Sequence, residues 1–258
     1  TLAKLWPQHF IIMSGKKINA AIVGASGYSG EELVRLLLGH PHVNLSVLTS
    51  RQYAGQAVTS VSPRFAGHAG ASDLTISEPS IDLVADKAQA VFLALPHGVA
   101  AEFAEPLLAA NAKVIDLSAD FRLSDASVYE EFYGNPHPAP KLLAQSVYGM
   151  PELHRDAIRD ANLIASPGCY PTSILLPTVP LLRAGLIKST GIIADSLSGV
   201  SGAGRNVSAD FLYTECNESA RPYGIPKHRH LSEIEQELSL VADAQMTVQF
   251  SPHLIPIN

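Results

Sequence analysis

The feature that most constrains the fold is a glycine-rich turn between two apolar runs. Residues 17–23 read KINAAIV and predict a buried β-strand, while residues 31–38 carry apolar side chains at helical spacing. Between them, Gly24, Gly27 and Gly30 recur at every third position. This order opens a dinucleotide-binding unit, because glycines let the backbone approach a pyrophosphate and the free N–H groups of a helix start bind it. The spacing differs from the common G-x-G-x-x-G, so an ordinary strand-to-helix turn is the alternative.

The end of the next predicted strand, residues 44–49, indicates which cofactor is used. NAD-binding units often carry an acidic residue there, which binds the ribose 2′-hydroxyl. This chain instead continues with Ser50 and Arg51. A hydroxyl and a guanidinium suit a 2′-phosphate, so we expect NADP rather than NAD. The alternative for Arg51 is a solvated loop cation.

Strands and helices continue to alternate after this unit. Residues 90–95 and 113–117 are predicted strands, and residues 99–110 between them are a predicted helix. Such alternation predicts an α/β fold with a doubly wound parallel sheet. Residues 121–140 are rich in tyrosine and proline, and we expect them to form loops.

We expect three parts along the chain. Residues 1–14 form an N-terminal extension, residues 15–165 an NADP-binding Rossmann domain, and residues 166–258 a second α+β domain. The predicted elements of the second domain are strands at 192–197 and 247–250 and a helix at 234–241.

Composition narrows the functional classes. The 258 residues are 47% hydrophobic and 16% charged, with a formal net charge of -6. No apolar run reaches the roughly 18 residues of a membrane span, and no basic stripe suggests a nucleic-acid partner. Two cysteines do not make a disulfide framework, which fits a reducing cytoplasm. The first residues lack the pattern of a signal peptide.

Cys169 stands where a thiol could be reactive. Pro167 and Gly168 form a turn before it, and residues 174–182 continue with apolar side chains at helical spacing. A helix N-terminus favours the thiolate, which is the nucleophile, whereas a free thiol is only a few per cent ionised at neutral pH. The alternative is a small buried apolar residue.

His228 and His230 are the candidates for proton transfer, because imidazole titrates near neutrality. In an extended segment the two side chains would share one face, so the sequence does not choose between them. The alternatives are a solvated surface loop and a two-histidine metal site. Because no further ligands lie nearby in the sequence, we expect no metal.

Eight motifs resemble, in type and order, those of the N-acetyl-gamma-glutamyl-phosphate reductases. They are GASGYSG at 24–30, TSR at 49–51, LPHG at 95–98, DLSADFR at 116–122, YGMPEL at 148–153, SPGCYPT at 166–172, SGVSGAGR at 198–205 and HRH at 228–230. The resemblance runs from about residue 17 to the last residue. It implies a Rossmann domain and an α+β domain for catalysis and dimerisation, similar in plan to aspartate-semialdehyde dehydrogenase, in a homodimer or homotetramer. Family members continue past the position matching Asn258, so we expect the second domain to be C-terminally incomplete.

The resemblance also implies a reaction and its residues. N-acetyl-L-glutamyl 5-phosphate would be reduced by NADPH to the 5-semialdehyde, with release of phosphate, through a thioester on Cys169. His228 is favoured as the acid/base over His230. The alternatives are a related acyl-phosphate reductase and a non-catalytic NADP-binding protein. Substrate binding is expected from Arg122, Arg205 and Glu215, and cofactor binding from Gly24, Ser26, Gly27, Tyr28, Ser29, Gly30, Ser50, Arg51, Pro96 and Gly202.

Overall fold

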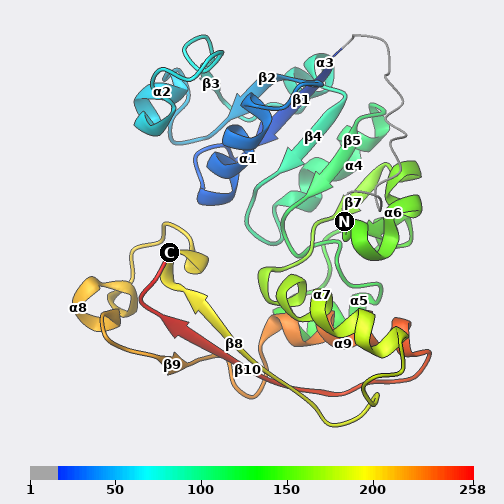
Figure 1. Ribbon diagram of the computed structural model, residues 1–258. Coiled ribbons are helices and arrows are strands. Elements are labelled where there is room, and N and C mark those ends of the chain that lie inside the picture. The colour runs from blue at the N-terminus through cyan, green and yellow to red at the C-terminus, as the bar shows by residue number, and fades with distance from the viewer. Residues whose placement is uncertain (1–16) are drawn as a thin grey trace, which may run out of the picture.

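The computed structural model describes residues 17–258, so the extension expected at residues 1–14 lies outside the described residues. Figure 1 shows two units, a larger one built on a wide sheet and a smaller one built on a narrow sheet and two helices. Within the described residues, no helix is long and apolar enough to cross a membrane.

The larger unit contains a seven-stranded parallel sheet, as the strand and helix alternation predicts. The strand order is β3-β2-β1-β4-β5-β7-β6. The strands are β1 (Ile18–Val23), β2 (Val43–Thr49), β3 (Ile76–Ser77), β4 (Ala90–Leu93), β5 (Lys113–Asp116), β6 (Ser146–Tyr148) and β7 (Leu163–Ala165). The helices are α1 (Tyr28–Leu38), α2 (Val58–Val61), α3 (Ile81–Lys87), α4 (Ala100–Ala109), α5 (Ala126–Tyr133) and α6 (Pro151–Asp160).

Both faces of this sheet are covered, which explains why its strands are mainly apolar. Along β1, Ala20 and Ile22 belong to one apolar cluster with Val34 of α1. The residues between and after them, Ala21 and Val23, belong to the opposite cluster, which includes α4. Alternate side chains of a strand point to opposite faces, so a sheet covered on both sides has no polar face.

The smaller unit packs two helices on a three-stranded sheet. The helices are α7 (Cys169–Arg183) and α9 (Arg229–Ala242), with the short α8 (Tyr213–Cys216) at a distance from them. The strands are β8 (Ile192–Gly199), β9 (Arg221–Pro222) and β10 (Val248–Ile255). β10 lies between the others, parallel to β8 and antiparallel to β9. Ile174 and Leu175 of α7, Ile234 and Leu238 of α9 and Phe250 of β10 share one apolar cluster.

Three sequence expectations need correction. The region 121–140 contains α5, which Asp125 caps by accepting a hydrogen bond from the amide of Ser127. The strand expected at 247–250 continues through Pro252, since β9 pairs only with the two residues after it and needs no amide from the proline. Helix α9 begins at Arg229 rather than at residue 234, because His228 caps it.

Candidate active site

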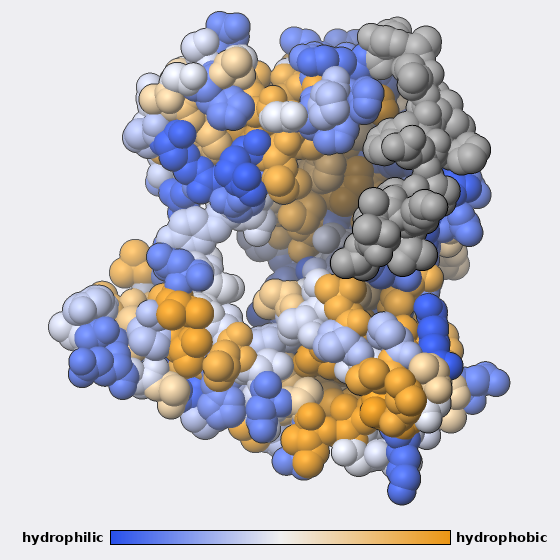
Figure 2. All heavy atoms as spheres, in the orientation of Figure 1, coloured by the Kyte–Doolittle hydropathy of each residue, from blue (hydrophilic) through white to orange (hydrophobic). Residues whose placement is uncertain are grey.

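A cleft of about 1430 Å³ lies between the two units. Figure 2 shows the hollow between them. Every predicted cofactor-binding residue lines this cleft, and so do Cys169, His228, His230, Arg122 and Arg205. Residues up to about 200 positions apart in the sequence therefore meet in one space.

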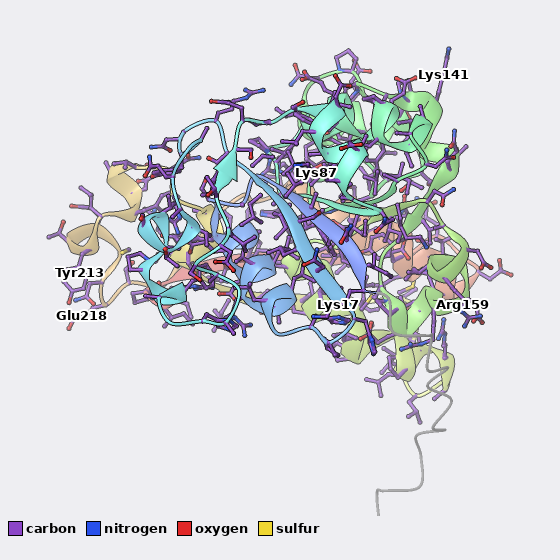
Figure 3. All side chains as sticks on the ribbon, turned by 90° about the horizontal axis from the view of Figure 1, so that it is seen from above. Lys17, Lys87, Lys141, Arg159, Tyr213 and Glu218 are labelled. Carbon is purple, nitrogen blue, oxygen red and sulfur yellow. The ribbon has the colours of Figure 1, made fainter. Side chains whose placement is uncertain are left out.

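Glu215 is the one predicted site residue that does not line the cleft. It lies in α8 and is exposed. Tyr213 and Glu218, which flank it in the sequence, stand at the outer tip of the smaller unit (Figure 3). Glu215 thus lies outside the cleft in this structure, and its expected approach to the substrate stays a prediction.

The nucleotide end of the cleft is formed by backbone. Gly24 has φ +93°, and a Cβ there would overlap the carbonyl oxygen of Ala94. A Cβ on Gly30 would overlap the carbonyl oxygen of Gly24. Gly27 is the N-cap of α1 and offers no capping side chain, so free N–H groups of the first turn remain available. This cradle fits a pyrophosphate.

The residues after β2 fit a phosphorylated ribose. The hydroxyl of Ser50 lies 2.8 Å from that of Ser26, which fixes the two loops against each other. Arg51 follows, is exposed and lines the cleft. Residues 49–51 contain no carboxylate, which would repel a 2′-phosphate.

Cys169 is the first residue of α7, as its sequence context predicts, and its thiol is exposed. Gly168 is the N-cap and offers no capping side chain. A Cβ on Gly168 would lie 2.7 Å from Nε2 of His230 and 3.0 Å from Nη1 of Arg122. The imidazole of His230 therefore packs directly on the turn that carries the thiol.

The two histidines occupy different positions, which the sequence could not distinguish. His228 caps α9, and its Nδ1 accepts a hydrogen bond of 3.1 Å from the amide of His230. The neutral ring of His228 therefore carries its proton on Nε2. His230 lies in the first turn of α9, and its Nδ1 is buried without a partner.

Both imidazoles are neutral at physiological pH. Partial burial, together with the guanidinium of Arg229, lowers the pKa of His228 to about 4. Partial burial, together with Arg122, lowers the pKa of His230 to about 3. Partial burial and Arg229 likewise lower the pKa of His97, which lines the cleft, to about 4. A neutral imidazole can accept a proton from a thiol.

Glu233 is a site residue that the sequence analysis missed. Its side chain is only 2% exposed. Oε1 accepts hydrogen bonds from the amide of Gly168, at 2.8 Å, and from the hydroxyl of Tyr148, at 2.7 Å. Burial raises the pKa of Glu233, while Arg122 opposes this rise. In the sequence, a glutamate of an amphipathic helix reads as part of the solvated face, although its position beside core residue Ile234 was a signal.

Arg122 is largely occupied by the protein itself. Its Nε donates to the carbonyl of Ser166 and its Nη2 to that of Leu117, both at 2.8 Å. Its Nη1 lies 3.6 Å from Oε2 of Glu233. The guanidinium thus fixes the segment before Cys169, and only Nη1 is not committed to a backbone oxygen.

Arg205 lies at the nucleotide end of the cleft. Its guanidinium is 2.6 Å from a carboxylate oxygen of Glu31, in the first turn of α1, and lies 4.7 Å above the ring of Tyr28. It links the glycine-rich segment of the smaller unit to the start of α1. In the described part of the chain, no three His, Cys, Asp or Glu side chains form a group that could hold a metal ion.

Comparisons with known proteins agree with this architecture. The family model of the semialdehyde dehydrogenase NAD binding domain matches residues 19–161, and that of the dimerisation domain matches residues 169–258. The crystal structure of aspartate semialdehyde dehydrogenase II from Vibrio cholerae is similar, with a TM-score of 0.65 and 17% identity over 94% of this chain and 71% of that one. That likeness supports the fold alone, and confirms the expected α/β class.

Relatives with higher identity are named N-acetyl-gamma-glutamyl-phosphate reductase. The one from Akkermansia muciniphila is 55% identical over 244 residues, which cover 94% of this chain and 70% of the relative. The one from Moorella thermoacetica is 50% identical over 241 residues, which cover 93% of this chain and 69% of the relative. These matches confirm the resemblance found in the motifs. The chain belongs to the N-acetyl-gamma-glutamyl-phosphate reductases, enzymes of the semialdehyde dehydrogenase family.

Proposed function

We propose that this enzyme reduces N-acetyl-L-glutamyl 5-phosphate to N-acetyl-L-glutamate 5-semialdehyde with NADPH and releases phosphate, a step of arginine biosynthesis. One observation carries the chemistry: an exposed thiol at the start of α7 shares a cleft with the glycine cradle at the start of α1. The names of relatives that are 50–55% identical support the choice of substrate.

In the first half-reaction, Cys169 acts as the nucleophile. Its Sγ attacks the acyl carbon, the bond from that carbon to the phosphate oxygen breaks, and a thioester remains on the enzyme. The partial positive charge at the start of α7 stabilises the thiolate. Arg122 fixes the turn before the thiol through the carbonyl of Ser166.

In the second half-reaction the thioester is reduced. When held by the cradle of Gly24, Gly27 and Gly30, NADPH would supply the hydride for this reduction of the thioester carbon. The thiohemiacetal formed on Cys169 then releases the aldehyde, and the sulfur leaves as thiolate. A neighbouring acid protonates the oxygen anion as the thiohemiacetal forms, and the same group takes this proton back when the carbon–oxygen double bond re-forms and the carbon–sulfur bond breaks.

We assign the proton transfers to His230 rather than to His228. The Nε2 of His230 lies at Gly168, beside the nucleophile, and the ring is neutral at physiological pH. His228 uses the lone pair of Nδ1 as a helix cap, so the nitrogen left to face the cleft carries a proton and cannot accept one. Its role is to position His230 and to start α9.

For the cofactor, we propose that the cradle of Gly24, Gly27 and Gly30 binds the pyrophosphate and that Ser50 and Arg51 bind the 2′-phosphate. The remaining cofactor contacts are assigned to the other residues that line this end of the cleft, Ser26, Tyr28, Ser29, Pro96 and Gly202.

We assign substrate binding to the arginine side chains whose guanidinium groups are not fully paired within the protein. Arg122 offers Nη1 to the acyl phosphate. Arg229, which stands between the two histidines in the sequence, also lines the cleft and adds a second cation. Arg205 is paired with Glu31 at the nucleotide end, so we assign it to closing the cleft over the cofactor. Glu215 has no assigned role.

The smaller unit matches a dimerisation domain, and we propose that it forms a homodimer or homotetramer through its sheet. Ile193 and Leu197 of β8 are 64% and 66% exposed on one face of that sheet. Burying such side chains against a second copy is favourable. Both cysteines are free, which fits a cytoplasmic enzyme.

The reverse reaction tests this proposal. N-acetylglutamate semialdehyde, phosphate and NADP should yield NADPH, measured by absorbance, and Cys169→Ala should abolish the signal while NADP still binds. Equal activity with aspartate semialdehyde would instead indicate a related acyl-phosphate reductase. Binding of NADP without any turnover would indicate a non-catalytic protein, and near-normal turnover of Cys169→Ala would refute the thioester.

A further inference from the structure

Two buried polar atoms without a hydrogen-bond partner belong to neighbouring side chains of the site. They are Nδ1 of His230 and Oε2 of Glu233, in the part of the chain that the structure describes. The two residues are three positions apart in α9, so their side chains lie on one face of the helix. Buried polar atoms are normally satisfied, so such a pair calls for a functional explanation.

The two side chains also share their surroundings. Oε1 of Glu233 accepts from the amide of Gly168, and Nε2 of His230 lies 2.7 Å from the place that a Cβ on the same glycine would occupy. Nη1 of Arg122 is 3.6 Å from Oε2 of Glu233 and would be 3.0 Å from a Cβ on Gly168. Both unpartnered atoms therefore lie in one small region behind the nucleophile.

We propose that Glu233 is a positioning residue for the reaction, whose Oε2 accepts the Nδ1 proton of His230, directly or through one water. This inference rests on the proposed function of His230 as the proton carrier. A donor and an acceptor are complementary here, and each removes the cost of the other's burial.

The consequence for chemistry is a fixed tautomer. With its proton on Nδ1, His230 presents the lone pair of Nε2 toward the turn of Cys169, so it can accept the thiol proton. The carboxylate then stabilises the imidazolium that forms, against the repulsion of Arg122 and Arg229. His228 has the opposite tautomer, because its Nδ1 accepts the amide of His230.

Glu233 also contacts both the segment of the base, His230, and the turn before the nucleophile, Cys169. Its other oxygen, Oε1, accepts from the amide of Gly168 and from Tyr148 of the larger unit. One carboxylate thus sets the position of the turn before Cys169 and the orientation of the imidazole that serves it. This arrangement fixes the thiol of Cys169 and the imidazole of His230 relative to each other through contacts among β6, α7 and α9.

Glu233→Gln separates the two tasks. The amide oxygen can still accept from Gly168 and Tyr148, while the NH₂ group that replaces Oε2 can only donate, and it forces His230 into the wrong tautomer. We expect kcat of the reverse reaction to fall about 10²-fold or more, the lower range for losing a general base, with an unchanged KM for NADP. Alkylation of Cys169 by iodoacetamide should slow as well, and this readout needs no substrate.

The matched control is Glu237→Gln. Glu237 lies one turn further along α9 and is equally buried, at 2% exposure, but its carboxylate contacts His154 and Gln236, both at 3.0 Å, rather than the amide of Gly168. Its kcat and alkylation rate should stay within about twofold of wild type. An equal loss in both variants would mean that any change of buried charge in α9 disturbs the site, and would overturn the proposal.

A double-mutant cycle decides whether Glu233 acts through His230. On a His230→Ala background, Glu233→Gln should cost no further alkylation rate or kcat, because residues that act as a unit are non-additive. Equal losses on both backgrounds would overturn the proposal. In wild-type enzyme, nitrogen-15 spectra of labelled histidine should show His230 protonated on Nδ1, and a proton on Nε2 would overturn it even if no variant folds. Because the spectra and the alkylation rate need no turnover, they separate this inference from the substrate assignment.

Discussion

Two helices point their N-termini into the same cleft, and they are built in different ways. Helix α1 begins after Gly27 and helix α7 after Gly168, and neither glycine provides a capping side chain. The start of α1 is shaped by nearby glycines whose Cβ atoms would overlap the adjacent backbone. The start of α7 is shaped by side chains, since Glu233 accepts from the amide of Gly168 and Arg122 donates to Ser166.

The two helix starts are built differently because one binds an anion and the other carries a nucleophile. A pyrophosphate is bound by backbone N–H groups, so a short continuous segment is enough. A thiolate nucleophile needs a base at hydrogen-bond distance and a fixed orientation, which only side chains from other elements can provide. We therefore expect changes near α7 to act through distant residues and changes near α1 to act locally.

The largest effect should come from removing the base at α7. His230→Ala should lower kcat of the reverse reaction about 10²–10⁴-fold, the usual range for a general acid/base, with NADP binding unchanged. His228→Ala removes a helix cap and should mainly cost about 0.5–2 kcal/mol of folding stability. Steady-state rates and thermal unfolding of the two variants measure this contrast. A larger rate loss in His228→Ala would reverse the assignment.

The next effect should appear at the other end of the cleft. Arg51→Ala removes the cation assigned to the 2′-phosphate. A hydrogen bond to a charged group contributes about 1.5–3 kcal/mol, so affinity for NADPH should fall about ten- to hundredfold. Affinity for NADH should be unchanged, and titration calorimetry with both cofactors measures the ratio. An equal loss of affinity for NADPH and NADH would show that Arg51 does not bind the 2′-phosphate.

A third test compares the two N-cap glycines. A Cβ at Gly168 would lie 2.7 Å from His230, whereas one at Gly27 would meet only the carbonyl oxygen of Gly24, at 3.8 Å. Gly168→Ala should therefore cost about 1–3 kcal/mol of stability, as overpacking does, and also slow the reaction. Gly27→Ala should unfold near the wild-type denaturant midpoint. Similar midpoints for the two variants would contradict the tight packing at α7.

The smallest expected effect is on the pH dependence of folding stability. The pKa values of His230 and His228 fall from 6.5 to about 3 and about 4 in the folded protein. Below about pH 6.5 the unfolded chain binds protons that the folded chain does not, so stability should decrease as the pH falls from 6.5 toward 4. Asp116 opposes this trend, because burial raises its pKa to about 6 and the folded state then binds the proton.

Comparing variants isolates the histidine contribution. His230→Gln should lose less stability than wild type between pH 6.5 and 5, by under about 1 kcal/mol per pH unit since the ring is partly solvated. Denaturant unfolding at several pH values measures the slope, and the contribution of Asp116 cancels in the difference. Parallel slopes for the two proteins would show that His230 is not held neutral by its surroundings.

Features that depend on residues adjacent in sequence could be predicted before the structure was known. The strand, glycine turn and helix at 18–38 form as expected because periodicity and glycine conformation are local properties. The same reasoning placed Cys169 at the start of a helix, since the turn and the apolar period adjoin it in sequence. The alternation of strands and helices likewise predicted the parallel sheet.

The side chains that surround the thiol, in contrast, were found only in the folded structure. Arg122, Tyr148 and the α9 residues Glu233 and His230 come from three separate segments, and their meeting depends on how the smaller unit packs against the sheet. The folded structure also removed Glu215 from the cleft and paired Arg205 with Glu31. A local sequence pattern gives the spacing of the apolar residues and the backbone angles that each residue tolerates. It does not report which distant donor satisfies a buried carboxylate, and that partner gives Glu233 its role.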